Sequence, residues 1–566
     1  MATANTIWQI AFGDYDFAID RKALTYRLTE TKTGTVWADG LPVGWLELEE
    51  RATGTRTRYD FGSMRLVSLS EKAGVQGKRI LFGLDCQGIP VDLYFTCSQK
   101  EIQLTVEASR DTRTHDVQDV CLLPGLVSVP GDGVSYLVIP HREGAMVQAT
   151  APPAVSAALP IWDADNGVTM PFVGAVRCAD RAHAVSALAL ITDSAYGVFH
   201  LERSAEAGAF VETRYTRDPE RRRLDIRVIV LPEQNHVAIA RAYRDKLVGD
   251  KNHVTLRRKA REHPALESLL GGALIHLWNA TSPVEPQLAA RLHEIGVDRS
   301  VCVLADTPPS ASVASPFKEL EGVDAIELAG ITTRLDATSA PSRWDIMDQR
   351  LQSLADAQGR FGIVGSDFGA DWSAIACHYW RRYFDEIGAG PLGSGYTPLP
   401  LYATVYHDAV IAYPSNHPDP THPEEFLRSL LSVSPPLLYL DCTAENRTDW
   451  AAQERAYAVL APLHRLCFPA FLTEHRFLTP DYLVEEARYS NGAYVLVNQS
   501  ETDAYENEQF LIPPLGFYAE HAQMIAYDAL RVGGQTFETR AFRIRRSRDE
   551  KPLAESAYIL SQEFLL

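Results

Sequence analysis

The chain has 566 residues, of which 46% are hydrophobic and 22% are charged, a composition typical of folded globular proteins and not of disordered or low-complexity ones. Its 54 Lys and Arg residues stand against 73 Asp and Glu residues, so the formal net charge is −19. An acidic surface repels phosphate backbones and anionic lipid headgroups, which excludes nucleic acid and membrane surfaces as expected partners. A neutral carbohydrate is compatible with this charge.

The cysteine pattern and the start of the chain point to a location. The eight cysteines lie singly, without a CxxC pair, which favours reduced thiols over a disulfide framework or a zinc site. Residues 1–8 contain no signal-peptide pattern, and no window holds 18 consecutive apolar residues. We therefore expect a soluble cytoplasmic protein, and the sequence leaves a homo-oligomer open.

The first part of the chain has the pattern of strands. Residues 1–235 contain many short alternating runs, such as Ile7–Phe12 and Val91–Cys97. Short strands with almost no helical pattern are typical of a large antiparallel β-sandwich. From His236 to Val248 apolar residues recur at helical spacing, and a polar, basic stretch follows. Residues 236–265 are therefore predicted to form a helical connector.

Residues 266–478 alternate between strand-like and helix-like patterns. Repeated βα units imply parallel strands, and seven or eight of them predict a (β/α)8-type barrel. The span is shorter than the roughly 250 residues of a typical barrel, and the interval from Ala325 to Asp336 is short enough that one helix is expected to be missing. The expected strands are Ala273–Leu277, Ser300–Leu304, Ala325–Leu328, Thr333–Asp336, Gly362–Gly365, Leu401–Tyr406 and Pro436–Leu440, and the expected helices are Pro286–Ile295, Trp344–Gln358, Trp372–Ile387, Pro423–Ser432 and Asp449–His464.

The strand pattern returns in residues 479–566, which are predicted to form a small C-terminal β domain. Asn491 and Gly492 lie between two strand-like runs, and this dipeptide supplies the positive φ angles that a tight hairpin turn needs. A β-hairpin is therefore expected within Tyr489–Asn498.

Acidic residues follow four of the predicted barrel strands, at the C-terminal ends where barrel enzymes place their reactive groups. They are Asp336, Asp367, Asp408 and Asp441. Glycoside hydrolysis needs one carboxylic acid to protonate the leaving oxygen and one carboxylate to attack the anomeric carbon or activate water, so acids at one barrel mouth suit it. Asp336 and Asp367 are 367 − 336 = 31 residues apart, so adjacent strands would present them side by side. The alternative use of each acid is a helix N-cap.

Other residues near these strand ends are candidates for binding. Gly365 and Gly369 flank Asp367 and are predicted to let a ligand approach the backbone. Aromatic residues could form a floor on which sugars stack, although core packing is their commoner use. The predicted substrate-binding residues are Trp278, Trp372, Tyr406, His407, Asp408 and Asp441. The His- and Pro-rich residues 416–423 lack a third clear ligand, and the sequence has no phosphate-binding glycine-rich loop, so we predict no metal site and no cofactor.

The order of domains and several motifs resemble glycoside hydrolases related to the endo- and exo-α-N-acetylgalactosaminidases. The stretches that carry the resemblance are Tyr136–Gly144, Ala242–Arg244, Leu335–Thr338, Gly365–Trp372, Pro400–Asp408 and Tyr489–Asn498. The resemblance implies a mutarotase-like β-sandwich and a catalytic barrel in a bacterial hydrolase of carbohydrate metabolism. It also implies that Asp336 is the nucleophile and that the residue at position 367 is the acid/base.

One departure from the family concerns the acid/base, because the family has a glutamate where this chain has Asp367. The aspartate carboxyl group lies closer to the backbone by roughly 1.5 Å. Carboxyl pairs about 5–5.5 Å apart retain the anomeric configuration, and pairs about 6.5–9.5 Å apart invert it. Retention with a shifted backbone, inversion and loss of activity all stay open.

Three functions are compatible with the sequence. The first is a glycosidase that cleaves an α-linked sugar. The second is a non-catalytic carbohydrate-binding or scaffold protein that kept the fold and lost turnover. The third assigns a sugar-epimerising role to His141 and Glu143 of the sandwich, for which ordinary turn residues are the alternative.

Overall fold

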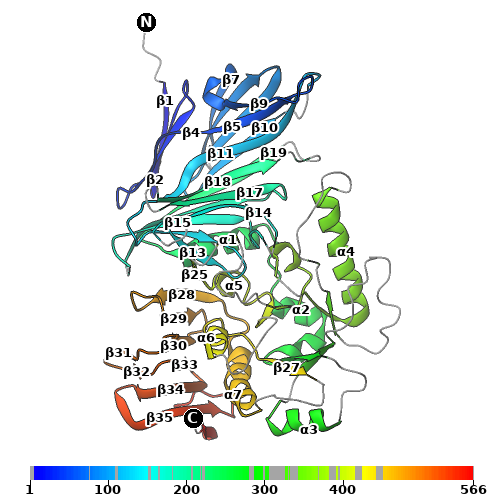
Figure 1. Cartoon of the computed structure of the whole chain (residues 1–566), viewed down its shortest axis with the longest axis vertical. Coiled ribbons are helices and arrows are strands. Elements are labelled where there is room, and N and C mark those ends of the chain that lie inside the picture. Colours follow the sequence, from blue (N-terminus) through cyan, green and yellow to red (C-terminus); the bar gives the residue numbers. More distant parts are fainter. Residues whose placement is uncertain are drawn as a thin grey trace. The chain divides into compact units, whose positions relative to one another are not determined.

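The computed structural model describes the chain except residues 1–5, 75–76, 109–111, 151–153, 164–165, 182, 205–207, 217, 219–222, 279–285, 298–299, 305–324, 329–330, 332–341, 367–368, 382–390, 393–395, 415–422, 442–449 and 565–566. The chain divides into two compact units. The first comprises Met1–Asp245, Thr333–Asp348 and Asp385–Leu399, and the second comprises Lys246–Thr332, Gln349–Phe384 and Pro400–Leu566. Figure 1 shows their elements, coloured along the sequence.

The first unit contains three antiparallel sheets (Figure 1). A four-stranded sheet has the order β1 (Ile7–Phe12), β2 (Tyr15–Asp20), β3 (Thr25–Glu30), β4 (Val36–Pro42). A ten-stranded sheet has the order β25 (Thr397–Pro398), β13 (Ala145–Gln148), β12 (Tyr136–Ile139), β15 (Phe172–Cys178), β16 (Ala184–Thr192), β19 (Arg223–Pro232), β10 (Ile102–Ala108), β9 (Ile89–Cys97), β8 (Gly77–Cys86), β7 (Arg65–Gly74). A six-stranded sheet has the order β14 (Val155–Pro160), β17 (Gly197–Ser204), β18 (Gly208–Thr216), β11 (His115–Val129), β5 (Gly44–Glu50), β6 (Arg56–Asp60).

The two larger sheets pack on each other, since β11 contacts β15 and β16. Their strands alternate as expected for sheets with one buried face: Leu93 and Phe95 of β9 are fully buried, while Tyr94 between them is less so. The strands predicted for residues 1–235 are thus confirmed. The predicted connector also begins at the expected residue, with α1 (His236–Gly249) and then α2 (Leu256–Glu262).

In the described part of the second unit, seven parallel strands lie in two sheets. One has the order β21 (Ser300–Leu304), β20 (Ala273–Trp278), β27 (Leu437–Asp441), and the other has the order β22 (Ala325–Leu328), β23 (Ile363–Ser366), β24 (Tyr379–Arg381), β26 (Ile411–Tyr413). The helices of this region are α3 (Pro286–Glu294), α4 (Arg343–Phe361), α5 (Leu401–Val405), α6 (Pro423–Leu431) and α7 (Trp450–Cys467). Strands and helices therefore alternate along much of the region, as predicted.

The two parallel sheets share one hydrophobic core. Leu274 of β20, Leu437 of β27, Ile363 of β23 and Ile411 of β26 belong to the same buried cluster. The strand β20 has as neighbours both β21, which follows it in the chain, and β27, the last of the parallel strands. In a closed barrel the first strand has these same two neighbours. Closure of the two sheets into one barrel, for which the described residues show no strand pair, stays a prediction.

Two predicted elements are wrong. Leu401–Tyr406 was expected to be a strand, but Leu401–Val405 is a short helix with every residue buried. A run that is apolar on all sides has no period that distinguishes a helix from a strand. The helix expected over Trp372–Ile387 is, in its described part, a 3₁₀ turn at Asp371–Ser373 and the buried strand β24. The strand expected at Thr333–Asp336 lies outside the described residues.

The chain ends in a nine-stranded antiparallel sheet, drawn in orange and red in Figure 1. Its order is β28 (Leu472–Phe477), β29 (Val484–Tyr489), β30 (Tyr494–Asn498), β33 (Phe517–His521), β34 (Met524–Val532), β32 (Phe510–Ile512), β31 (Tyr505–Glu506), and β35 (Gln535–Ser547) joins β34 to β36 (Ile559–Phe564). The predicted hairpin is confirmed as β29–β30, with Gly492 at φ +87°. Asn491 does not share that conformation.

Candidate functional site

The last described strands before the two predicted catalytic acids are neighbours. β22 and β23 are parallel, with Leu328 in register with Ser366. Asp367 is the next residue after the end of β23, and Asp336 follows the end of β22 by 336 − 328 = 8 residues. Asp336 and Asp367 themselves lie outside the described residues. Their roles therefore rest on the sequence and on these two strands.

Two further predicted residues are brought together at the level of the backbone. Trp278 ends β20 and Asp441 ends β27, and the parallel pairing places them directly opposite each other. Both stand at the C-terminal ends of their strands, as predicted from the sequence.

The sequence reasoning missed a buried ion pair between Glu327 of β22 and Arg381 of β24, the two strands that flank β23. Arg381 of β24 donates from Nη2 to Oε1 of Glu327 at 2.6 Å and from Nε to Oε2 at 3.0 Å. The Glu327 and Arg381 side chains are only 6% and 9% exposed. Such bidentate pairs fix the orientation of a carboxylate. The available signal was an acid inside the apolar run Ala325–Leu328.

The glycines around position 367 make room for aromatic rings. A Cβ on Gly365 would lie 2.2 Å from the ring of Tyr379, and a Cβ on Gly369 would lie 2.5 Å from the ring of Trp380. The space on the Cβ side of these glycines is therefore filled by protein, and the close approach of a ligand to their backbone stays a prediction. Trp372 is 9% exposed, and its Nε1–H has no acceptor among the described residues.

Tyr406 belongs to a buried aromatic cluster. Its ring lies 5.3 Å from that of Trp380 and stacks on the imidazole of His253 at 6.2 Å. The hydroxyl of the neighbouring Tyr402 donates to the carbonyl of Gly369 at 2.6 Å. Tyr406 is 2% exposed. The cluster thus contacts Gly369, in the segment that follows β23.

Asp408 is held in the interior by several contacts. Its Oδ1 accepts a hydrogen bond from His253 Nε2 at 3.0 Å, and its backbone carbonyl accepts from Leu256 at 2.7 Å. Close to it, the buried Lys259 donates to three backbone carbonyls, those of Ala374, Cys377 and Ala409, at 2.6, 2.6 and 2.8 Å. Burial lowers the pKa of Lys259 to about 7. These contacts tie α2 to the turn that contains Asp408.

His407 is also buried, and both of its ring nitrogens face backbone carbonyls. Nδ1 lies 2.7 Å from the carbonyl of Ala470, and Nε2 lies 3.3 Å from that of Val433. Burial lowers the pKa of His407, which favours a neutral ring that donates from one nitrogen only. The shorter contact makes Nδ1–H the donor. Tyr406, His407 and Asp408 are thus buried and contact other protein groups, and their role as substrate contacts stays a prediction.

In the first unit, His141 donates from Nδ1 to the carbonyl of Gly167 at 2.7 Å. The side chain is 1% exposed, and burial lowers its pKa to about 4. Its Nε2 has no partner in the described part of the chain. A buried, neutral imidazole at this position has the contacts of a structural turn residue.

The described residues contain no group of three His, Cys, Asp or Glu side chains placed to hold a metal ion. Residues 416–423, considered as a metal site in the sequence, lie almost entirely outside the described part. None of the helices that the structure describes combines the length and apolar composition of a membrane span.

Comparison with known proteins gives a clear match at the level of the fold. No protein-family model matches the chain. No curated protein matches it either. Among solved structures, α-N-acetylgalactosaminidase NagBb from Bifidobacterium bifidum in complex with GalNAc superimposes with a TM-score of 0.67 at 16% identity, covering 87% of this chain and 98% of that one.

Two other structures of the same enzyme agree. The ligand-free form superimposes with a TM-score of 0.66 at 17% identity, and the Gal-NHAc-DNJ complex with 0.66 at 16%, each over 87% of this chain and 98% of that one. At identities this low, these superpositions establish the fold and nothing beyond it. The chain is therefore a structural relative of glycoside hydrolases, as the sequence motifs indicated.

Proposed function

We propose that the protein is a glycoside hydrolase that cleaves an α-linked sugar with two carboxylates, Asp336 as the nucleophile and Asp367 as the acid/base. The observation that carries the proposal is the match to an α-N-acetylgalactosaminidase over 98% of that enzyme's length. Because NagBb is described as acting on α-N-acetylgalactosaminides, these are the first substrates to test. The isolated cysteines support the reducing cytoplasm as its location, and the family resemblance implies a bacterial source.

The strand arrangement supports this assignment of the acids. We propose that the two parallel sheets close into one barrel, because they share a core and because β20 neighbours both the second and the last parallel strand. In such a barrel the C-terminal strand ends form one mouth. β22 and β23, which precede Asp336 and Asp367 in the chain, are adjacent in it.

We propose different roles for the residues around the mouth of the barrel. The Glu327–Arg381 pair flanks the strand that leads to Asp367 and would fix charge beside it. We propose Trp278, Trp372 and Asp441 as sugar contacts, and we retain Tyr406, His407 and Asp408 as residues that position the site from the interior. In the reaction, Asp367 protonates the leaving oxygen while Asp336 attacks the anomeric carbon, and water then releases the sugar.

The test is hydrolysis of aryl and methyl α-N-acetylgalactosaminides by the wild type, Asp336→Asn and Asp367→Asn, with the exposed Asp348→Asn as the control. Asp336→Asn should lose activity on every substrate, because attack at the anomeric carbon is needed whatever the leaving group. Asp367→Asn should lose less activity on dinitrophenyl than on methyl glycosides, because dinitrophenolate leaves without a proton. Full activity of either variant on methyl glycosides would overturn its assignment.

The alternative is a carbohydrate-binding protein that has lost turnover, and the aspartate at position 367 favours it. Calorimetry with N-acetylgalactosamine separates the two. Binding by the wild type, with no product from any aryl glycoside over days, would support the binding protein and contradict the hydrolase.

A further inference from the structure

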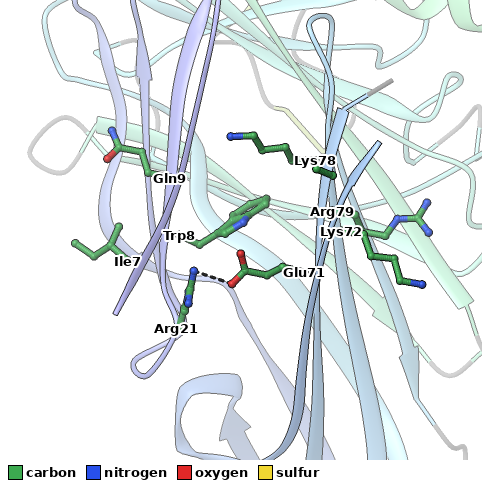
Figure 2. Close-up of a pocket in the computed structure, with 9 residues that line it drawn as sticks. Ile7, Trp8, Gln9, Arg21, Glu71, Lys72, Lys78 and Arg79 are labelled. Carbon is green, nitrogen blue, oxygen red and sulfur yellow. Dashed lines mark ion pairs between the residues drawn. The ribbon is translucent and has the colours of Figure 1, made fainter. Parts of the chain in front are cut away.

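A crevice of about 530 Å³ opens in the first unit beside β1 and the β7–β8 hairpin (Figure 2). Trp8 of β1 forms part of its wall, and Arg21, which follows β2, and Glu71 of β7 approach each other next to it. Ligand pockets typically measure about 300–1,000 Å³, so the volume suits one or two sugar rings.

The charge of this crevice is opposite to that of the chain. Its lining includes four cationic residues, Arg21, Lys72, Lys78 and Arg79, against the single acid Glu71. The whole chain has 19 more acids than bases. Clustered like charges repel one another, so a concentration of cations on an acidic protein favours an anion.

On the side of the crevice where Trp8 lies, one cation, Lys78, has no ion pair among the described residues. Arg21 Nη2 lies 2.7 Å from Glu71 Oε1, which neutralises both groups. The backbone of Lys78 pairs within the sheet, but its side chain takes part in no ion pair or hydrogen bond among the described residues. It stands opposite Ala73, and Ala73 lies on the same face of β7 as Glu71, two residues earlier. Figure 2 shows Lys78 on the side of Trp8, whereas Lys72 and Arg79 project from the other side of the strands.

We propose that this crevice binds an acidic saccharide through its anionic group, a carboxylate or a sulfate ester. Lys78 would contact the anion, Arg21 would add a second cationic donor, and the indole edge of Trp8 would contact the sugar ring. Lys72 and Arg79 would add longer-range attraction. Glu71 would compete with the ligand for Arg21. The saccharide part of the proposal rests on the proposed glycosidase function, and the anion part does not.

The test is calorimetry on the full-length Asp336→Asn variant, so that binding is measured without turnover. The probes are glucuronic acid, galactose 6-sulfate, neutral galactose and inorganic sulfate. The acidic sugars should bind, and their affinity should fall with added salt. Lys78→Gln should weaken binding at least tenfold, the exposed control Lys100→Gln should leave it unchanged, and Glu71→Gln should tighten it several-fold.

Each outcome decides the proposal. Binding of glucuronic acid alone or of the sulfated sugar alone identifies the source of the anion and supports it. Equal binding of neutral galactose, or an unchanged affinity in Lys78→Gln, would overturn it. Binding of inorganic sulfate without either sugar would overturn the saccharide part. A failure of hydrolysis leaves these binding results unaffected, so the two proposals fail separately.

Discussion

Breaking the Glu327–Arg381 pair should be far more costly than replacing it. The two side chains are 6% and 9% exposed and are joined by contacts of 2.6 and 3.0 Å. Glu327→Leu alone leaves the Arg381 charge buried without its partner, and Arg381→Met alone removes the cation that the buried Glu327 carboxylate contacts. Each single change should lower the free energy of unfolding by about 3–5 kcal/mol.

The double variant Glu327→Leu with Arg381→Met should recover most of that loss, because apolar side chains of similar volume carry no desolvation cost. Urea denaturation of the four proteins gives the coupling free energy of the pair. The exposed pair Arg258–Glu262, at 3.5 Å, is the matched control, and its coupling should stay below about 1 kcal/mol. A coupling free energy for Glu327–Arg381 no larger than that of Arg258–Glu262 would refute the reasoning.

The same double variant tests whether the pair serves the site. If the pair serves the proposed site beside the strand that precedes Asp367, a double variant as stable as the wild type should still lose hydrolysis of aryl α-N-acetylgalactosaminides. A stable double variant with wild-type kcat/KM would show that the pair is only structural.

Three further predictions concern single positions. Burial lowers the pKa of Lys259 from 10.5 to about 7, so between these pH values the unfolded chain binds more protons than the folded one. The free energy of unfolding of the wild type, relative to that of Lys259→Met, should therefore rise as the pH increases from about 7 to about 10. Urea titrations in which this difference does not change with pH would contradict the prediction. Gly365→Ala should cost about 1–3 kcal/mol by overpacking against Tyr379, and Tyr379→Leu should recover part of it in the same assay. Trp344→Phe removes the Nε1–H that donates to Asp218 at 2.9 Å and should cost about 1–3 kcal/mol, whereas an unchanged melting temperature would show that this bond adds no stability.

Elements with a clear local pattern were predictable from the sequence. The alternating strands of the first unit, the helix that starts at His236 and the hairpin at Gly492 follow from period and turn chemistry that a few residues specify. The buried segments Leu401–Val405 and Tyr379–Arg381 have no exposed face and hence no period, so their type is decided by the packing around them.

The candidate site was harder to predict, because its contacts join distant residues. Glu327 and Arg381 are 381 − 327 = 54 residues apart and meet only because β22 and β24 both pair with β23. Asp408 was expected to face a substrate, but His253, 155 residues away in the chain, holds it in the interior. Sequence spacing predicts where along a strand a side chain lies, but not which distant residue is its hydrogen-bond or ion-pair partner.

The most direct test of the two-carboxylate mechanism is a crystal structure of the Asp367→Asn variant with a bound α-N-acetylgalactosaminide. We expect the side chains at positions 336 and 367 on opposite sides of the glycosidic bond, about 5–5.5 Å apart. A sugar bound elsewhere, or either side chain turned away from it, would contradict the mechanism.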